Sequence, residues 1–518
     1  MAARGPTRPY RGHRAALALA ALALAALALA AAACGTTTSA GPSPSTTATT
    51  AAPATTLPAV APPAPVAWSA CPGNTGEVIQ CGTVDVPEDY RDPAAGTLQL
   101  AVTRSPALDP TARTGTLFFN PGGPGESGNQ ILPLALDLLP STVRDDFDVV
   151  SFDPRGVGAS DPLQCGTSPS AVTSALPVPA AGEPIPSAPV FTAMARACAA
   201  RHPVLTPLVD TTNTARDMDR IRQALGLATI SYYGLSYGTV LGTVYAELFP
   251  HRLRSMVLDG AVDVNATLAR QADEQAPAIE ASLDHLLATC PPATCPLGSD
   301  PRAGFAALAA SLTRSPLPAP GGGDDQPVTV GDLDMATLFV LSVPSSTVPY
   351  LQALTSARAG DGAPLRTLAL GFEEDIDGTP LVDAEWAISC NDAAVHPDAT
   401  AAGAQARALA ARYPLLGAYA VTYQLAGCVA WPPATRPVTG VHPTGTPPVL
   451  VIGNTGDPNT PLVGAQHLAA AYPDASQLTW QGWGHTWLLN GSTDRCMQRA
   501  VTGYLVGGTL PPAGTTCR

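Results

Sequence analysis

The segment TISYYGLSYGT, residues 229–239, runs from apolar, β-branched and aromatic residues into a serine flanked by two glycines. The residues that follow, VLGTVYAELF, are typical of a buried helix, which Pro250 ends. A strand, a Gly-x-Ser-x-Gly turn and a helix in this order present a serine as a nucleophile. The glycines allow a sharp turn, so Ser236 is expected at the carboxyl end of the strand, near the helix amides. The five-residue pattern alone is weak, and a glycine-rich turn with an inert serine is the alternative.

Further strand signals place this turn in a larger sheet. Short, nearly continuous apolar runs occur at residues 116–119, 147–152, 230–233, 255–259, 448–453 and 477–480. Helical stretches separate these runs, which predicts an α/β fold with a mostly parallel sheet and helices on both faces. The long interval 261–446 is rich in Ala, Leu and Pro and has few strand signals. Because an interval of this length does not stay structureless in a compact domain, we predict a mainly helical cap over the carboxyl edge of the sheet.

Composition limits the classes of function. The chain has 518 residues, of which 46% are apolar, so it can bury a large core. Its formal net charge of −14 argues against a nucleic-acid partner. We predict five segments: a signal peptide at 1–33, a flexible Thr/Ser/Ala/Pro tether at 34–66, the first part of the core at 67–260, the cap at 261–446, and the second part of the core at 447–518.

The N-terminus is typical of an export signal. Several arginines precede an almost pure Ala/Leu run, and small residues lead into Cys34. This junction favours a lipoprotein signal in which Cys34 becomes lipidated, with simple cleavage and a permanent membrane anchor as alternatives. We therefore expect an extracellular protein, either secreted or held at the cell surface, that meets the membrane only through such an anchor.

Ten cysteines remain after Cys34, and an even number suggests disulfides in an exported protein. The spacings favour pairing between sequence neighbours, although sequence alone leaves the connectivity open. The favoured pairs are Cys71–Cys81, Cys165–Cys198, Cys290–Cys295, Cys390–Cys428 and Cys496–Cys517. No pair has the Cys-x-x-Cys spacing that is typical of metal sites, so we expect no metal.

A glycine-rich loop is predicted to end at the same sheet edge as Ser236. The loop NPGGPGESG, residues 120–128, directly follows a buried strand. Its backbone N–H groups are not shielded by side chains, and together with the amide of Tyr237 they can stabilise a developing oxyanion. Gly123 is the candidate donor in this loop, and a tight structural turn is the alternative.

An acid and a base follow the last two predicted strands. Asp457 comes after the strand at 448–453, and His485 lies in a glycine-rich loop after the strand at 477–480. Taken alone, Asp457 is as well explained by a turn or a helix cap. In the chain order Ser, Asp, His, we predict Ser236 as nucleophile, Asp457 as the acid that orients the base, and His485 as general base and acid. This chemistry needs no cofactor.

These segments resemble the α/β-hydrolase fold and, more narrowly, the secreted bacterial tripeptidyl aminopeptidases, relatives of prolyl iminopeptidase. The resemblance rests on NPGGPG at 120–125, DPRGVGAS at 153–160, DMDRIRQALG at 217–226, YGLSYGT at 233–239 and the TAP-like end at 447–517. It implies a serine peptidase that releases tripeptides or short peptides from free N-termini through an acyl-enzyme. Ser236, Asp457 and His485 match the positions of the family's triad. Glu126 stands where the family is expected to have a small residue.

The resemblance also implies an anionic group in the cap that holds the substrate ammonium. Asp392, in AISCND at 387–392, and Glu374, in the acidic run EED at 373–375, are the candidates. A solvated acidic loop is the alternative for that run. Two other functions compete with the peptidase: a carboxylesterase or lipase with the same triad, and an inert surface-binding lipoprotein, because a fold and a triad do not fix the leaving group.

Overall fold

The computed structural model describes residues 57–72, 79–174, 181–322, 326–371 and 381–518. The expected signal peptide, Cys34 and Glu374 lie outside these ranges. No helix in the described ranges combines the length and the apolar character that crossing a membrane requires.

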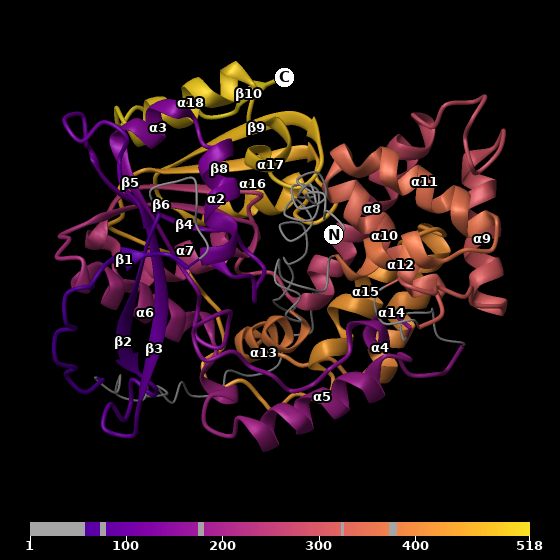
Figure 1. The fold of residues 1–518 in the computed structure, drawn as a ribbon, viewed down its shortest axis with the longest axis horizontal. Helices are drawn as coiled ribbons and strands as arrows, with labels where there is room; N and C mark the ends of the chain where they lie inside the picture. Colours follow the sequence, from indigo (N-terminus) through magenta and orange to yellow (C-terminus); the bar gives the residue numbers. More distant parts are fainter. Residues whose placement is uncertain (1–56, 73–78, 175–180, 323–325, 372–380) are drawn as a thin grey trace, which may run out of the picture.

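Within the described residues, ten strands form one sheet in the order β1-β2-β3-β5-β4-β6-β7-β8-β9-β10 (Figure 1). The strands from β1 to β5 in this order pair antiparallel, and those from β5 to β10 pair parallel. The strands are β1 (Ser69–Ala70), β2 (Gln80–Pro87), β3 (Thr97–Ser105), β4 (Gly115–Asn120), β5 (Phe147–Phe152), β6 (Ile230–Leu235), β7 (Leu253–Asp259), β8 (Val449–Gly456), β9 (Ala475–Trp483) and β10 (Thr515–Cys517). The predicted α/β fold with a mostly parallel sheet is confirmed.

Helices cover both faces of the sheet because successive strand residues point to opposite sides. In β4, Phe118 belongs to one hydrophobic cluster, whereas Leu117 and Phe119 belong to the other. The first cluster is completed by α6 (Thr211–Ala224), α7 (Tyr237–Leu248) and α16 (Leu462–Ala471). The second is completed by α2 (Gly128–Leu138), α3 (Ser141–Asp146), α17 (Trp487–Gly491) and α18 (Arg495–Leu505).

The cap consists of the helices between β7 and β8, drawn in salmon to orange in Figure 1. They are α8 (Leu268–Ala288), α9 (Pro301–Arg314), α10 (Val330–Ser342), α11 (Thr347–Arg358), α12 (Ala363–Leu370), α13 (Val382–Asp392), α14 (Ala399–Arg412) and α15 (Tyr419–Gln424). Short 3₁₀ turns complete the chain: η1 (Thr206–Leu208), η2 (Pro250–Arg252), η3 (Pro344–Ser346) and η4 (Ala426–Cys428).

A second insertion joins the cap from within the range that the sequence analysis gives to the core. Helices α4 (Pro169–Thr173) and α5 (Ala188–Arg201) follow β5 but lie beside the cap helices (Figure 1). The rings of Phe191 and Trp386 meet edge to face at 5.0 Å, and Thr173 donates a hydrogen bond to Asp332. The cap is therefore built from two separate parts of the chain.

Five disulfides stabilise the described chain. They join Cys71–Cys81, Cys165–Cys198, Cys290–Cys295, Cys390–Cys428 and Cys496–Cys517. These are the pairs of sequence neighbours that the spacings favour. Bonds of this kind persist in oxidising compartments such as the bacterial cell exterior.

A buried ion pair holds the antiparallel edge of the sheet to the rest of the core. The Arg155 guanidinium donates to both carboxylate oxygens of Asp217 at 2.7 Å, and neither side chain is exposed. The Tyr90 hydroxyl donates to the same carboxylate at 2.8 Å, and Arg155 also donates to the backbone oxygens of Pro87 and Glu88. This bidentate pair connects the end of β5 with β2 and α6.

Arg155→Met removes the cation and leaves the Asp217 carboxylate buried. We expect the free energy of unfolding to fall by about 3–5 kcal/mol, because an uncompensated charge stays in the core. Adding Asp217→Leu should restore most of the loss, and urea unfolding with intact disulfides measures both changes. Arg91→Met is the control, since its half-exposed pair with Asp89 is worth about 0–1 kcal/mol. Equal losses in the two single variants would contradict the role of the buried pair.

Candidate active site

Ser236 occupies a strained turn between β6 and α7. Its φ of 54° and ψ of −123° lie outside the regions that side chains usually adopt. The turn is held on both sides, because the Ser236 amide donates to the Asp259 oxygen at 2.9 Å and the Ser236 oxygen accepts from the Thr239 amide at 2.8 Å. Glycine is required next to it: a Cβ on Gly234 would lie 2.4 Å from the oxygen of Gly238.

The glycine-rich loop after β4 packs directly on this turn. Gly122 and Gly123 have φ values of 110° and 97°, which only glycine adopts readily. A Cβ on Gly122 would lie 3.0 Å from the Cβ of Ser236 and 3.5 Å from the amide nitrogen of Tyr237. The structure therefore brings the loop that carries Gly123 and the first amide of α7 to the same side of Ser236.

Asp457 and His485 form a buried pair. His485 Nδ1 lies 2.9 and 3.0 Å from the two carboxylate oxygens of Asp457, and the side chains are 0% and 2% exposed. The carboxylate also accepts from the amides of Asn459, Thr460 and Thr486, at 2.9 to 3.1 Å. The turn that Asp457 makes with its own loop thus coexists with its contact to the imidazole.

The tautomer of His485 follows from this contact. A carboxylate only accepts hydrogen bonds, so Nδ1 carries the proton and Nε2 presents a lone pair. Within the described part of the chain, Nε2 is buried and makes no hydrogen bond. An imidazole oriented by a carboxylate, with an available Nε2, is the arrangement of a general base.

The end of β7 connects this base with the serine. A Cβ on Gly260 would lie 3.4 Å from His485 Cε1, and the preceding residue, Asp259, accepts the amide of Ser236. Ser236 and His485 therefore flank the same strand end. The carboxyl ends of β4, β6, β8 and β9 supply the Gly123 loop, Ser236, Asp457 and His485, which is the sheet edge where ligands of such folds bind.

Asp392, a candidate for holding the substrate amine, is the last residue of α13, and its carboxyl group contacts the first residue of α6. Its two carboxyl oxygens accept from the amide and the hydroxyl of Thr211 at 2.8 and 2.5 Å, at the beginning of α6. The Thr211 hydroxyl also contacts the hydroxyl of Tyr237. Burial raises the pKa of Asp392 to about 8, which favours the neutral carboxyl group over the carboxylate that would attract an ammonium.

Two supporting residues are missing from the sequence-based site. The Thr460 hydroxyl lies 2.9 Å from Asp457 and 3.2 Å from His485 Nδ1, in the loop that follows β8. Asp259 is an acid at the carboxyl end of an apolar strand, and that placement is the signal that could have identified it. Thr460 has no comparable signal, because its role depends on where a distant histidine lies.

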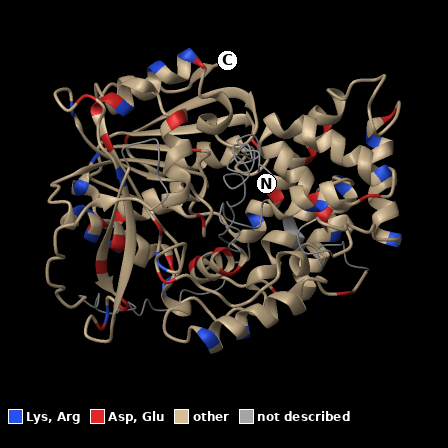
Figure 2. Ribbon diagram, viewed as in Figure 1, with Lys and Arg blue, Asp and Glu red and all other residues tan. Residues whose placement is uncertain are grey.

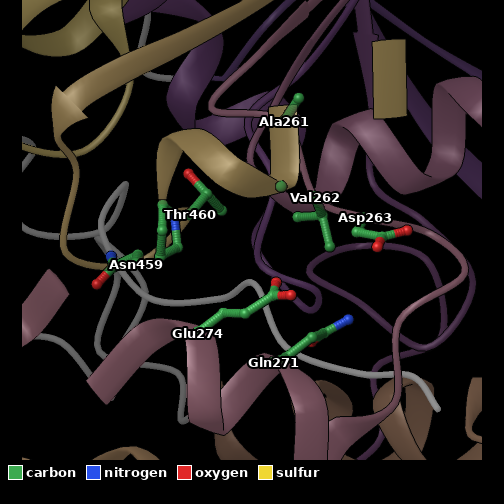
Figure 3. A pocket seen from close by; sticks show the side chains of 9 residues that line it. Ala261, Val262, Asp263, Gln271, Glu274, Asn459 and Thr460 are labelled. Atoms are coloured by element: carbon green, nitrogen blue, oxygen red, sulfur yellow. The ribbon is translucent and has the colours of Figure 1, made fainter. Parts of the chain in front are cut away.

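A pocket adjoins the loop of Asp457 on the side that faces the cap. Figure 3 shows Asn459 and Thr460 at one side of it and the side chains of Gln271 and Glu274, from α8, at the other. Ser236 and His485 do not line this pocket. The pocket therefore lies between the acid loop and α8 of the cap.

The sheet, the strained serine turn and the buried acid–base pair define an α/β hydrolase. Residues 115–335 match the family model of the α/β hydrolase fold, and residues 413–517 match that of the TAP-like proteins. The chain is 33% identical to serine protease Hip1 of Mycobacterium tuberculosis, over 88% of this chain and 91% of that protein. It is 32% identical to carboxylesterase B of the same species (87% and 89% covered) and 30% identical to tripeptidyl aminopeptidase of Streptomyces lividans (87% and 86% covered). The chain belongs to the α/β hydrolases with a TAP-like C-terminal region.

Asp392→Asn tests the raised pKa. The folded state keeps a proton on Asp392 that the unfolded chain releases near its usual pKa of about 4. The stabilising contribution is therefore complete below that pKa and is lost as the pH rises towards 8. We expect the melting temperature of the variant minus that of the wild type to increase between about pH 5 and about pH 8.5.

Asp398→Asn is the matched control, because Asp398 caps α14 at an exposed position. Its melting temperature relative to wild type should change much less over the same pH range. If the difference in melting temperature between Asp392→Asn and the wild type stays constant over this pH range, Asp392 is ionised in the folded protein at neutral pH.

Proposed function

We propose that the protein is a serine exopeptidase that releases tripeptides or other short peptides from free N-termini. The observation that carries the proposal is the buried Asp457–His485 pair beside the strained Ser236. Within the described residues, Nε2 of His485 makes no hydrogen bond. The similarity to serine protease Hip1 and to tripeptidyl aminopeptidase supports a peptide as substrate. A complete Ser, Asp and His set argues against an inert surface-binding lipoprotein.

The proposed reaction proceeds through an acyl-enzyme. Ser236 Oγ attacks the scissile carbonyl carbon while His485 Nε2 accepts the hydroxyl proton, and Asp457 stabilises the imidazolium. The amides of Tyr237 and Gly123 donate to the oxyanion. His485 then delivers the proton to the leaving nitrogen as the C–N bond breaks. Water, activated by the same imidazole, attacks the ester and releases the N-terminal fragment.

Recognition of a free N-terminus requires an anion, and in an extended tripeptide the ammonium lies at most about 10 Å from the scissile carbonyl. Helix α13, at the junction of cap and core, carries acidic residues (Figure 2). A Cβ on Gly125 would lie 2.9 Å from the amide nitrogen of Glu385, whose carboxylate accepts from the Tyr423 hydroxyl at 2.9 Å. Glu126 follows Gly125 directly and is 2% exposed. We propose Glu385 and Glu126 as the ammonium-binding residues ahead of Asp392. Glu374, outside the described residues, is a further candidate.

Carboxylesterase activity is the second candidate function, because the similarity to carboxylesterase B is nearly as strong as that to Hip1.

We further propose that the protein is exported, with Cys34 as a lipidation site. The five disulfides support an oxidising compartment.

Ser236→Ala should fold normally and lower the turnover of a tripeptidyl anilide by about 10⁴- to 10⁶-fold, because the nucleophile is lost.

In the wild type, acetylation of the substrate amine should lower kcat/KM by about 100-fold or more, since the buried anion loses its partner. Mass spectra of the products from a mixed peptide pool give the fragment length. Equal turnover of acetylated and free peptides, with faster hydrolysis of short-chain esters, would favour the esterase.

Glu385→Gln should raise KM for the free-amine anilide by about 10-fold and leave the hydrolysis of a neutral short-chain ester nearly unchanged, because only the former carries an ammonium. Glu247→Gln, at an exposed position of α7, is the control and should change neither substrate. A similar loss with both substrates would place Glu385 in the support of the oxyanion loop instead.

A further inference from the structure

One acid of the core contacts the segments of both the nucleophile and the base. Asp259 ends β7 and is 0% exposed. Its backbone oxygen accepts the amide of Ser236 at 2.9 Å. Its carboxylate accepts the amides of Trp487 and Leu488 at 2.9 Å and the Tyr233 hydroxyl at 3.1 Å. Main chain and side chain of one residue thus hold two segments that are far apart in sequence.

The two amides that donate to the Asp259 carboxylate belong to the first residues of α17, the helix that follows His485. Asp457 accepts the amide of Thr486 at 3.1 Å, and Asp259 accepts the next two amides, at the start of α17. Thr486 itself has a φ of 62°, an unusual value for a β-branched residue. Two acids, at the end of β7 and directly after β8, therefore fix consecutive amides and hold this conformation of the backbone beside the base.

Direct packing adds to these hydrogen bonds. Gly260, with a φ of 65°, has no room for a side chain: a Cβ would lie 2.7 Å from Thr486 Cγ2 and 3.4 Å from His485 Cε1. The imidazole thus rests against the backbone that follows Asp259. Asp259 and Gly260 contact both catalytic segments, so a shift of this strand end changes the separation of the two side chains.

The electrostatic cost of Asp259 indicates that it does more than support the fold. Its described partners are neutral N–H and O–H donors, and it takes part in no ion pair within the described residues. Burial, with a smaller contribution from the charge of Asp457, raises the pKa of Asp259 to about 6. A buried carboxylate without a cation costs free energy, and a neutral residue could cap α17 at a lower cost.

We propose that Asp259 is a positioning residue that sets the separation and orientation of Ser236 Oγ and His485 Nε2. This inference rests on the proposed serine chemistry, although not on whether the substrate is a peptide or an ester. Because Asp259 acts through backbone amides, it should affect the chemical step and leave substrate binding unchanged.

Asp259→Asn keeps the shape of the side chain but loses one of the two acceptor oxygens that hold α17. We expect kcat to fall by about 10- to 100-fold, with KM within about 2-fold of wild type, because a small displacement of the base is enough for such a loss. The rate at which a fluorophosphonate labels Ser236 should fall by a similar factor. That label needs the aligned serine and imidazole but no bound peptide, so it reports on the alignment alone.

Asp494→Asn is the matched control, since the Asp494 side chain caps α18 through the Met497 amide at 2.8 Å and accepts neither the Ser236 amide nor the first amides of α17. It should lower the melting temperature slightly and leave kcat and the labelling rate unchanged. If Asp259→Asn does not fold, Tyr233→Phe removes one hydrogen bond from the same carboxylate and should lower both rates by about 2- to 10-fold.

Wild-type kcat and labelling in the variants, or a change in KM alone, would overturn the positioning role. Failure of the proposed function would look different. A wild-type protein whose Ser236 is not labelled would refute the serine chemistry and the inference with it. A wild-type protein that is labelled but cleaves only esters would refute the exopeptidase alone, and the comparison of Asp259→Asn with Asp494→Asn would still decide the inference with an ester substrate.

Discussion

The contact between Asp457 and His485 depends on the pairing of β8 with β9. The two strands run parallel in regular register up to Asn454 and Trp480, and the register then shifts so that Gly456 pairs with Trp483. The Gly484 amide donates to the Gly456 oxygen at 3.1 Å, which keeps the two segments together beyond the ends of β8 and β9. A side chain at position 456 would collide with the Trp483 indole at 2.5 Å. The shape of this strand end therefore brings the acid and the base together.

The cap takes part in the site and does more than cover it. The amide of His485 donates to the oxygen of Ser342, the last residue of α10, at 2.9 Å. Asn459, in the acid loop, donates to the hydroxyl of the same serine at 3.0 Å and accepts from Gln275 of α8 at 2.9 Å. Hydrogen bonds thus join the cap to the loops of both Asp457 and His485. A displacement of α10 would therefore alter the position of the base.

Local sequence signals predict the parts of this protein that local physics determines. The continuous apolar runs become β4 to β9, and the serine turn has the strand and helix that its glycines require. The antiparallel edge is not predicted, because its buried residues alternate with more exposed ones and form no continuous apolar run. The membership of α5 in the cap depends on the contact of Phe191 with Trp386, and the surroundings of Asp392 depend on Thr211. Contacts between residues so far apart leave no pattern in either segment.

The two acids beside His485 are suited to different tasks. Asp457 has the imidazole and several amides as partners, so its negative charge is well compensated and can stabilise the imidazolium. Asp259 has fewer donors, and burial raises its pKa to about 6. As the pH falls through that value, Asp259 gains a proton and one of its oxygens ceases to be a good acceptor for the α17 amides. The support of the base therefore weakens in acid. A site built in this way is expected to work at neutral or alkaline pH.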